Sequence, residues 1–273
     1  MRNKELELTK GIYSRDVLKE WDRLMKDPVH KLEFDTTMRF LKKHLPKKGL
    51  ILDAGGGPGR YTIELAKLGY DVVLFDLVRA NLELAEEQIK KAKVGKHIKG
   101  IIEGTITDLT QFKNNSFDAV VCLGSPLSHV HPAKEREEAI AELVRVGKKS
   151  APIFVSVTGK FGPLANLPVN YVNEIEEKKH FMDYALRGDD RMWRGGYMHK
   201  FELNELKELF RNKVKFIESI GLEGLASVHP EAINEMAKNK KAWKNWMEVH
   251  YALCTHSVVV DISMHMMIVG NKK

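Results

Sequence analysis

The sequence predicts an α/β fold in which a doubly wound, mostly parallel sheet carries helices on both faces. Two observations support this fold class. Residues 50–76 read as strand, glycine turn, helix and strand, and further short apolar runs then alternate with amphipathic segments through most of the chain. Open sheets of this kind bind ligands beyond the carboxyl ends of their strands. We therefore expect the functional site at that edge of the sheet.

Two helices are expected before the first strand. Apolar residues recur at helical spacing from Ser14 to Leu45, and Pro28 interrupts the pattern. These helices either pack on the sheet or form a lid over the ligand. Tyr13 stands just ahead of them, where a lid would bring its aromatic ring near the ligand.

The glycine turn at residues 53–59 is the clearest functional signal. The apolar run Leu50–Leu52 is too short for a helix, and the glycines after it allow a sharp bend and close approach of a ligand to the backbone. A second apolar run, 72–75, ends at Asp76, where sheets of this type hold ribose hydroxyls. The unit is therefore expected to bind a nucleoside-like ligand.

The rest of the chain completes the alternation. Helices are predicted at 81–93, 133–146 and 203–210, and strands at 153–157, 214–220 and 264–269, with two further strand candidates inside 101–109 and 116–124. Right-handed crossovers between parallel strands place these helices on both faces of the sheet.

The spacing of the glycines distinguishes between nucleoside ligands. The dinucleotide fingerprint would place Arg60 where a small residue is needed. The pattern Asp53-x-Gly55-x-Gly57-x-Gly59 instead resembles motif I of the class I S-adenosylmethionine-dependent methyltransferases. The segments IIEGTITDL (101–109) and SFDAVVCLG (116–124) also resemble this family, which implies a seven-stranded Rossmann-like sheet with a reversed last strand.

The resemblance implies S-adenosylmethionine as cofactor and S-adenosylhomocysteine as product. Asp53 would face the ammonium group of the cofactor and Asp76 its ribose, while Thr105 stands where the family usually has an acid near adenine. The predicted cofactor contacts are Tyr13, Asp53, Gly55, Gly57, Gly59, Asp76, Leu77, Thr105, Ile106, Asp108 and Leu123.

The segment GSPLSH (124–129) has two interpretations. It resembles the Gly-Pro-Leu-Tyr-His-Leu segment of a subgroup of this family that also shares EWDRL, LEFDTT, DAGGGPGRY and a His-Lys pair at 199–200; His129 would then be a general base or orient the acceptor. Alternatively, it is a degenerate form of the Ser-Pro-Pro-aromatic motif of amino methyltransferases, and His129 could also simply cap the strand. The candidate catalytic residues are Ser125, His129, Tyr197 and His199.

Two long inserts are expected to form a helical cap that shapes the acceptor site. The predicted organisation is an N-terminal helical lid (1–48), a cofactor-binding core (49–158, 201–220 and 258–273) and cap inserts at 159–200 and 221–257. Aromatic residues and histidines concentrate in the inserts. No pair of histidines has the spacing of a zinc site, so no metal is expected.

Charge and composition bear on the acceptor and the setting. The net charge of +7, and the lysines at 238, 240, 241 and 244 interleaved with Trp243 and Trp246, favour N-methylation of an exocyclic amine in rRNA or tRNA. The alternative acceptor is a small molecule, methylated on nitrogen or oxygen inside the cap. The abundance of Lys and Glu suits a thermophile. A charged N-terminus and the lack of a long apolar stretch predict a cytoplasmic protein without a membrane partner.

Overall fold

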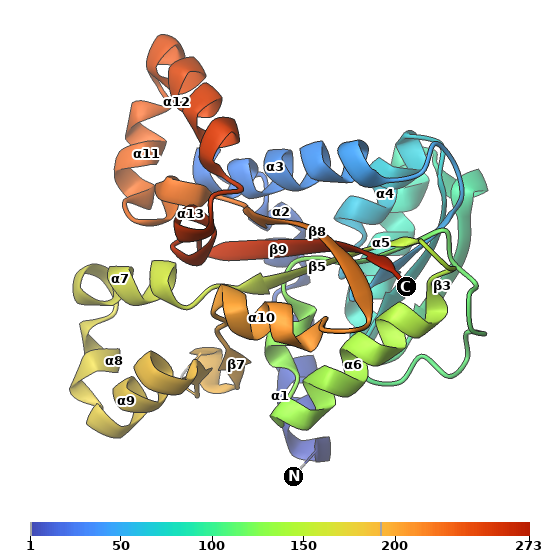
Figure 1. Ribbon diagram of the computed structural model, residues 1–273, viewed down its shortest axis with the longest axis horizontal. Helices are drawn as coiled ribbons and strands as arrows, with labels where there is room; N and C mark the ends of the chain where they lie inside the picture. Colours follow the sequence, from blue (N-terminus) through green and yellow to red (C-terminus); the bar gives the residue numbers. More distant parts are fainter. Residues whose placement is uncertain (1, 192) are drawn as a thin grey trace.

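The computed structural model describes residues 2–191 and 193–273 and has a single large sheet covered by helices on both faces (Figure 1). The strand order is β3-β2-β1-β4-β5-β9-β8, and only β9 runs antiparallel to its neighbours. The strands of this sheet are β1 (Leu50–Ala54), β2 (Asp71–Asp76), β3 (Ile98–Glu103), β4 (Ala119–Cys122), β5 (Pro152–Thr158), β8 (Val214–Gly221) and β9 (His265–Lys272). The predicted seven-stranded sheet with a reversed last strand is confirmed.

The two faces of the sheet are covered by different helices because alternate strand residues point to opposite sides. One face packs on α3 (Pro28–His44), α4 (Arg60–Lys67) and α5 (Arg79–Ala92). The other packs on α6 (Ala133–Val146), α10 (Leu203–Leu209) and α13 (Ser257–Asp261). This is the doubly wound arrangement that the alternating sequence pattern predicts.

The N-terminal region differs from the prediction, because it contains three helices rather than two: α1 (Arg2–Arg15), α2 (Val17–Arg23) and α3. Tyr13 lies inside α1, not ahead of the first helix. The sequence pattern missed α1 because its apolar residues are few and widely spaced among charged ones. Pro28 does not simply break a helix, since it occupies the first turn of α3, where a proline costs no hydrogen bond.

The two inserts form separate helical projections (Figure 1). The first contains α7 (Phe161–Asn170), α8 (Val172–Glu176), α9 (Lys178–Arg187) and a short strand pair, β6 (Asp189–Asp190) with β7 (Met198–His199), that was not predicted. The second contains α11 (Pro230–Met236) and α12 (Lys240–Leu253). The exact domain boundaries stay a prediction.

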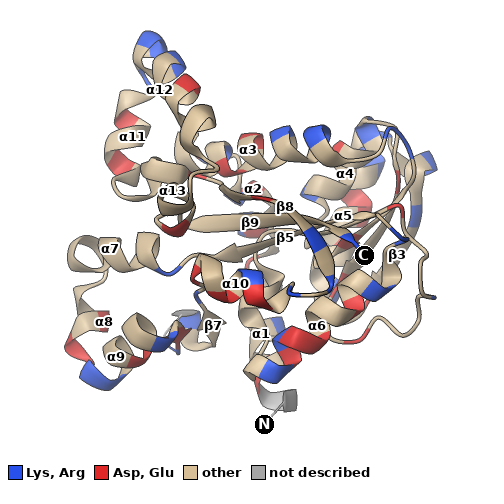
Figure 2. Cartoon of the chain, viewed as in Figure 1, with Lys and Arg blue, Asp and Glu red and all other residues tan. Residues whose placement is uncertain are grey.

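Charged residues of both signs are spread over the helices (Figure 2). Among the described residues, no helix combines the length and the apolar character that crossing a bilayer requires.

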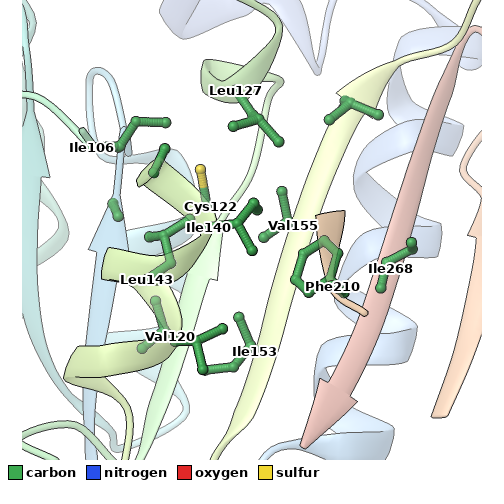
Figure 3. Close-up of a cluster of buried hydrophobic side chains, with 14 of the residues drawn as sticks. Ile106, Val120, Cys122, Leu127, Ile140, Leu143, Ile153, Val155, Phe210 and Ile268 are labelled. Atoms are coloured by element: carbon green, nitrogen blue, oxygen red, sulfur yellow. The ribbon is translucent and has the colours of Figure 1, made fainter. Parts of the chain in front are cut away.

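The largest cluster of buried hydrophobic side chains lies between the sheet and α6, α10 and α13. Ile140 and Leu143 of α6 meet Val120, Ile153 and Val155, which project from the central strands β4 and β5 (Figure 3). These side chains are fully buried. The packing holds the carboxyl ends of β1, β2 and β4 in place, and these ends carry the candidate site.

Candidate active site

A pocket opens at the carboxyl ends of β1, β2 and β4, and α1 and α2 lie over it. Its cavity volume is about 160 Å³, whereas one water needs roughly 10–15 Å³, so the pocket is large enough for a ligand. Lining residues come from α1, α2, the glycine turn, the ends of β2, β3 and β4, and the start of α6. No described residue of either insert lines it. The first insert does contact His129 from behind, through the Tyr197 carbonyl oxygen, so a cap over the acceptor site stays a prediction; α1 and α2 do line this pocket.

The three predicted glycines have different structural roles. Gly55 (φ +79°) lines the pocket, and a Cβ there would lie 2.4 Å from Pro126. Gly57 (φ +55°) also lines the pocket, and a Cβ there would have only Asn81 within 4 Å. Gly59 does not line the pocket; a Cβ there would press on Ala85 of α5 at 3.2 Å, so this glycine lets two helices pack closely.

Asp76 ties the glycine turn to the end of β2. One carboxylate oxygen accepts the Gly57 N–H (2.8 Å), and the other accepts the Val78 N–H (2.8 Å) and the Asn81 amide (3.3 Å). Burial outweighs these donors and raises the pKa of Asp76. The carboxylate lines the pocket with about one acceptor position left, since a carboxylate has roughly four.

Asn81 was not predicted from the sequence. It also lines the pocket, and its buried side-chain oxygen has no hydrogen-bond partner among the described residues. Asp76 and Asn81 together therefore offer adjacent acceptors to a vicinal diol.

Asp53 does not reach the pocket. Its side chain is fully buried beneath the glycine turn, where one oxygen accepts the Thr62 hydroxyl at 2.6 Å and the other has no partner among the described residues. Burial raises the pKa of Asp53 to about 7. The structure thus gives this residue a place under the turn rather than a direct contact with a ligand ammonium group.

This burial predicts an unusual pH dependence of stability. The folded protein keeps the Asp53 proton up to about pH 7, whereas the ordinary pKa is 3.8, so the wild type loses stability as pH rises between these values. Asp53→Asn should therefore be more stable than the wild type at pH 8, by about 2–4 kcal/mol, with a smaller advantage at pH 5. Urea unfolding at both pH values measures this difference.

Asp118→Asn is the matched control. Lys148 and the Leu50 N–H outweigh burial and lower the pKa of Asp118, so this variant should lose stability at pH 8. An equal effect of Asp53→Asn at both pH values would contradict the assignment.

The strand ends at 77 and 104–107 line the side of the pocket next to Asp76. Leu77, Thr105 and Ile106 lie there as predicted, and Leu123 lines the pocket at the end of β4. Thr105 shares a hydroxyl hydrogen bond of 3.0 Å with Thr107. Asp108 is exposed and does not line the pocket, and its carboxylate accepts the Thr110 hydroxyl at 2.6 Å.

Tyr13 and His129 meet across the pocket, from segments 116 residues apart. The Tyr13 hydroxyl lies 2.9 Å from Nε2 of His129, and Nδ1 of His129 lies 3.2 Å from the Tyr197 carbonyl oxygen. The carbonyl can only accept, so Nδ1 carries the proton and Nε2 accepts from the Tyr13 hydroxyl. Burial lowers the pKa of His129 to about 4. The imidazole is therefore neutral at pH 7.

The other three candidate catalytic residues lie outside the pocket lining. Ser125 is buried at the left-handed start of the turn 126–129, with φ +70°. The Tyr197 hydroxyl donates to Asp189 (2.6 Å) and accepts from Arg136 (3.1 Å). His199 lies between Asp189 and Glu205, which outweigh burial and raise its pKa. Tyr197 and His199 thus belong to a polar network that supports the segment carrying His129.

A buried ion network beside the pocket was not predicted. Arg23 of α2 forms an ion pair with Glu33 of α3 (2.6 Å) and also with Glu20 (3.0 Å), and Glu33 lies 3.6 Å from His265 of β9. Arg23 and Glu20 line the pocket. The segments EWDRL and LEFDTT contain Glu20, Arg23 and Glu33. Hydrophobic periodicity describes one helix or strand at a time, so it cannot predict that these two helices meet His265, about 230 residues later in the chain.

Arg60 lines the pocket, and its guanidinium stacks 3.7 Å from the Trp21 ring of α2 and donates to the Trp21 carbonyl. It therefore fastens α2 to α4. Trp21 itself does not line the pocket, in agreement with a packing role.

The residues present fit S-adenosylmethionine. Asp76 and Asn81 offer acceptors for a ribose, and the bare backbone at Gly57 leaves room beside them. Gly124 leaves open space beside the backbone, since a Cβ built there would have only the Arg23 guanidinium within 4 Å, at 3.6 Å. The carboxylate of the cofactor could approach the backbone at this point and meet the positive charge of Arg23.

Comparisons with known proteins agree with this fold. Residues 51–150 match a family model described as a methyltransferase domain. The glycine/sarcosine N-methyltransferase of Aphanothece halophytica is 27% identical over 137 residues, which are 50% of each chain. The chain thus spans about half the length of this curated relative.

Two solved structures share the fold over most of the chain. A Methanosarcina mazei protein described as a SAM-dependent methyltransferase has a TM-score of 0.57 at 20% identity, covering 85% of this chain and 96% of its own. The Burkholderia thailandensis 1,6-didemethyltoxoflavin-N1-methyltransferase has a TM-score of 0.60 at 12% identity, covering 100% of this chain and 91% of its own.

The sheet order with its reversed strand is the Rossmann-like fold that these methyltransferase structures share, and residues 51–150 match the methyltransferase-domain model. The particular subgroup suggested by DAGGGPGRY and the segment 124–129 stays a prediction.

Proposed function

We propose that the protein is an S-adenosylmethionine-dependent methyltransferase that acts on a small amine. The observation that carries this proposal is one continuous pocket, with Asp76 and Asn81 at one end and the Tyr13–His129 pair at the other, closed over by α1 and α2. A pocket with two differently equipped ends suits a nucleoside cofactor and a separate acceptor.

Each end has groups suited to one part of the cofactor. Asp76 and Asn81 bind the ribose, Leu77 and Ile106 enclose the adenine, and Arg23 binds the carboxylate near Gly124. The cofactor supplies a methyl group already activated on a sulfonium. The work left to the chain is alignment, which places the acceptor nitrogen within roughly 3–3.5 Å of the methyl carbon.

The charges of the pocket favour an amine over an anionic acceptor. Carboxylates line it at Glu5, Glu20, Asp76 and Glu135, against the guanidinium groups of Arg23 and Arg60. Glu20 contributes, after burial, to raising the pKa values of both Tyr13 and Asp76, so its charge acts across the pocket. The relatives named glycine/sarcosine N-methyltransferases also support nitrogen as the acceptor atom.

An RNA base as acceptor has less support. The lysines 238, 240, 241 and 244 are exposed at the far end of the second insert, around α12, and none lines the pocket (Figure 2). Trp243 and Trp246 are partly buried against the cluster of Val29 and Leu32, so less of each ring is available for stacking on bases. The lysines form a solvated helix face, and the pocket itself is rich in acidic groups.

His129 is expected to orient the acceptor rather than take its proton. A pKa of about 4 makes its imidazole a weak base at pH 7, and both ring nitrogens already have partners. His129→Ala should lower turnover about 10- to 100-fold and leave cofactor affinity within about threefold, since His129 lies at the acceptor end. Single-turnover rates and equilibrium dialysis measure the two quantities separately. If the variant turns over as fast as the wild type, His129 does not orient the acceptor.

The proposal is tested by measuring release of S-adenosylhomocysteine with panels of possible acceptors. Primary and secondary amines, including amino acids, should stimulate release, and matched alcohols and phenols should not. If only hydroxyl compounds stimulate release, the acceptor atom is oxygen and the amine proposal is wrong. If the protein binds the cofactor but neither panel stimulates release, the proposal of a small acceptor is wrong.

A further inference from the structure

A second cluster of polar side chains lies in the first insert, whose helices α8 and α9 project from the sheet (Figure 1), and none of its members lines the pocket. It contains Glu174 of α8, His180 of α9 and Asp190 of β6. One possible ligand atom from each residue lies within 4.8 Å of the other two. Three separate elements thus converge on one small volume.

The cluster contains buried polar atoms whose hydrogen-bonding capacity is unused. Both ring nitrogens of His180 and Oε2 of Glu174 have no hydrogen-bond partner among the described residues, although His180 is only 8% exposed. The hydroxyl of Tyr184, one turn after His180 on α9, is also buried without a partner. Because buried polar groups nearly always have partners, these atoms indicate a ligand.

The distances fit a metal ion better than a direct contact. His180 Nε2 lies 3.5 Å from Glu174 Oε2, which is too long for a good hydrogen bond. Two ligands bound at roughly 2.0–2.1 Å to a tetrahedral ion lie about 3.4 Å apart. The pair is therefore spaced as two corners of such a site.

Lys200 also touches the cluster, and its position is compatible with an ion. Its ammonium group lies 2.9 Å from Oδ2 of Asp190 and 4.1 Å from the centre of the Tyr184 ring. One carboxylate oxygen of Asp190 lies within 4.8 Å of the ligand atoms of Glu174 and His180, so the carboxylate that Lys200 contacts also faces the other two ligands. Carboxylates that bind metals are commonly held by such outer hydrogen bonds.

The other candidate cluster is already neutralised. Glu33, Glu223 and His265 also lie within ligand distance of one another. However, Arg23 neutralises Glu33, and the backbone and ring of His265 occupy both oxygens of Glu223. We therefore place no ion there.

We propose that Glu174, His180 and Asp190 bind a divalent transition-metal ion of the zinc class, which fastens α8 and α9 to the β6–β7 pair. One imidazole and two carboxylates are donors that suit Zn²⁺ and its neighbours, whereas Mg²⁺ and Ca²⁺ prefer oxygen ligands alone. The ion would be structural, since none of its ligands lines the methyltransferase pocket.

The test is zinc binding by the full chain, purified without a histidine tag and stripped with a chelator. Calorimetry should show one zinc per chain, and saturating zinc should raise Tm by about 5 °C or more at 100-fold excess over Kd. Mg²⁺ should do neither. His180→Gln and Glu174→Gln should each lose at least tenfold in zinc affinity, while His256→Gln, an exposed histidine of the second insert, should bind as the wild type does.

The wild type alone can overturn the proposal. Co²⁺ in place of zinc should give visible ligand-field absorption that zinc abolishes, and this readout does not depend on any variant folding. Absence of that absorption, zinc binding well below one equivalent, or equal affinity in a folded His180→Gln variant would each refute the site. Such a result would leave His180 and Glu174 as neighbouring side chains without an ion between them.

Discussion

Asp76→Ala is expected to weaken binding of S-adenosylmethionine about 10- to 100-fold. The Asp76 carboxylate already accepts three hydrogen bonds from the chain, so about one position remains for a ribose hydroxyl. A hydrogen bond to a charged acceptor is worth about 1.5–3 kcal/mol, and the variant also frees the Gly57 N–H that shapes the turn. Calorimetric titration with the cofactor, or with S-adenosylhomocysteine, measures the loss.

Asp71→Ala is the matched control for this variant. Asp71 begins the same strand, but it lies outside the pocket and pairs with Lys99 (3.2 Å). Its replacement should change cofactor affinity less than about twofold. If Asp76→Ala loses less than about threefold, under 0.7 kcal/mol, the ribose assignment is wrong.

Arg23→Ala is expected to lower the free energy of unfolding by about 3 kcal/mol, measured without ligand. Glu33 is 1% exposed, and burial alone would raise its pKa, but Arg23 and His265 outweigh burial and hold this pKa below its ordinary value. Removing Arg23 leaves a buried carboxylate with His265 as its remaining ion-pair partner, at 3.6 Å. Breaking a buried ion pair costs about 3–5 kcal/mol, and the lower value applies because Arg23 keeps 22% exposure.

A second substitution distinguishes loss of the pair from loss of packing. Arg23→Met combined with Glu33→Gln removes both charges at similar volume and should recover more than half of the lost stability, because a buried ion pair often contributes little over an uncharged replacement. If the double variant is as unstable as Arg23→Ala, the charges are not the cause.

Most of the sheet could be predicted from local sequence. Short apolar runs bounded by turn residues marked the central strands β1, β2, β4, β5 and β9, because a strand buried on both faces has few polar residues to interrupt it. Ala133–Val146 was predicted at the bounds observed for α6. The two-residue strands β6 and β7 are too short to leave a pattern.

The cofactor end of the pocket was easier to predict than the acceptor end. Gly55, Gly57 and Asp76 belong to one contiguous unit, and all three line the pocket. The acceptor end combines α1, α2 and the segment after β4, which only tertiary packing brings together. His199 was chosen from sequence resemblance and Tyr197 from the aromatic residues of the first insert, but both lie in the network behind His129.

Composition carried the least structural information. The net charge suggested RNA, but charges do not reveal which face they occupy, and the lysines around α12 lie away from the pocket. A thermophilic origin and a cytoplasmic location, both inferred from composition, stay predictions. The absence of a metal was inferred from spacing along the chain, which cannot detect ligands contributed by three separate elements.

The most direct test of the account follows a labelled methyl group from S-adenosylmethionine into a cell extract divided into RNA and small metabolites. The pocket predicts label in the metabolite fraction, on an amine, with little in RNA, and loss of this transfer in Asp76→Ala. Label recovered in RNA as a single modified nucleoside would contradict the small-amine proposal and show that α1 and α2 move aside to admit a base.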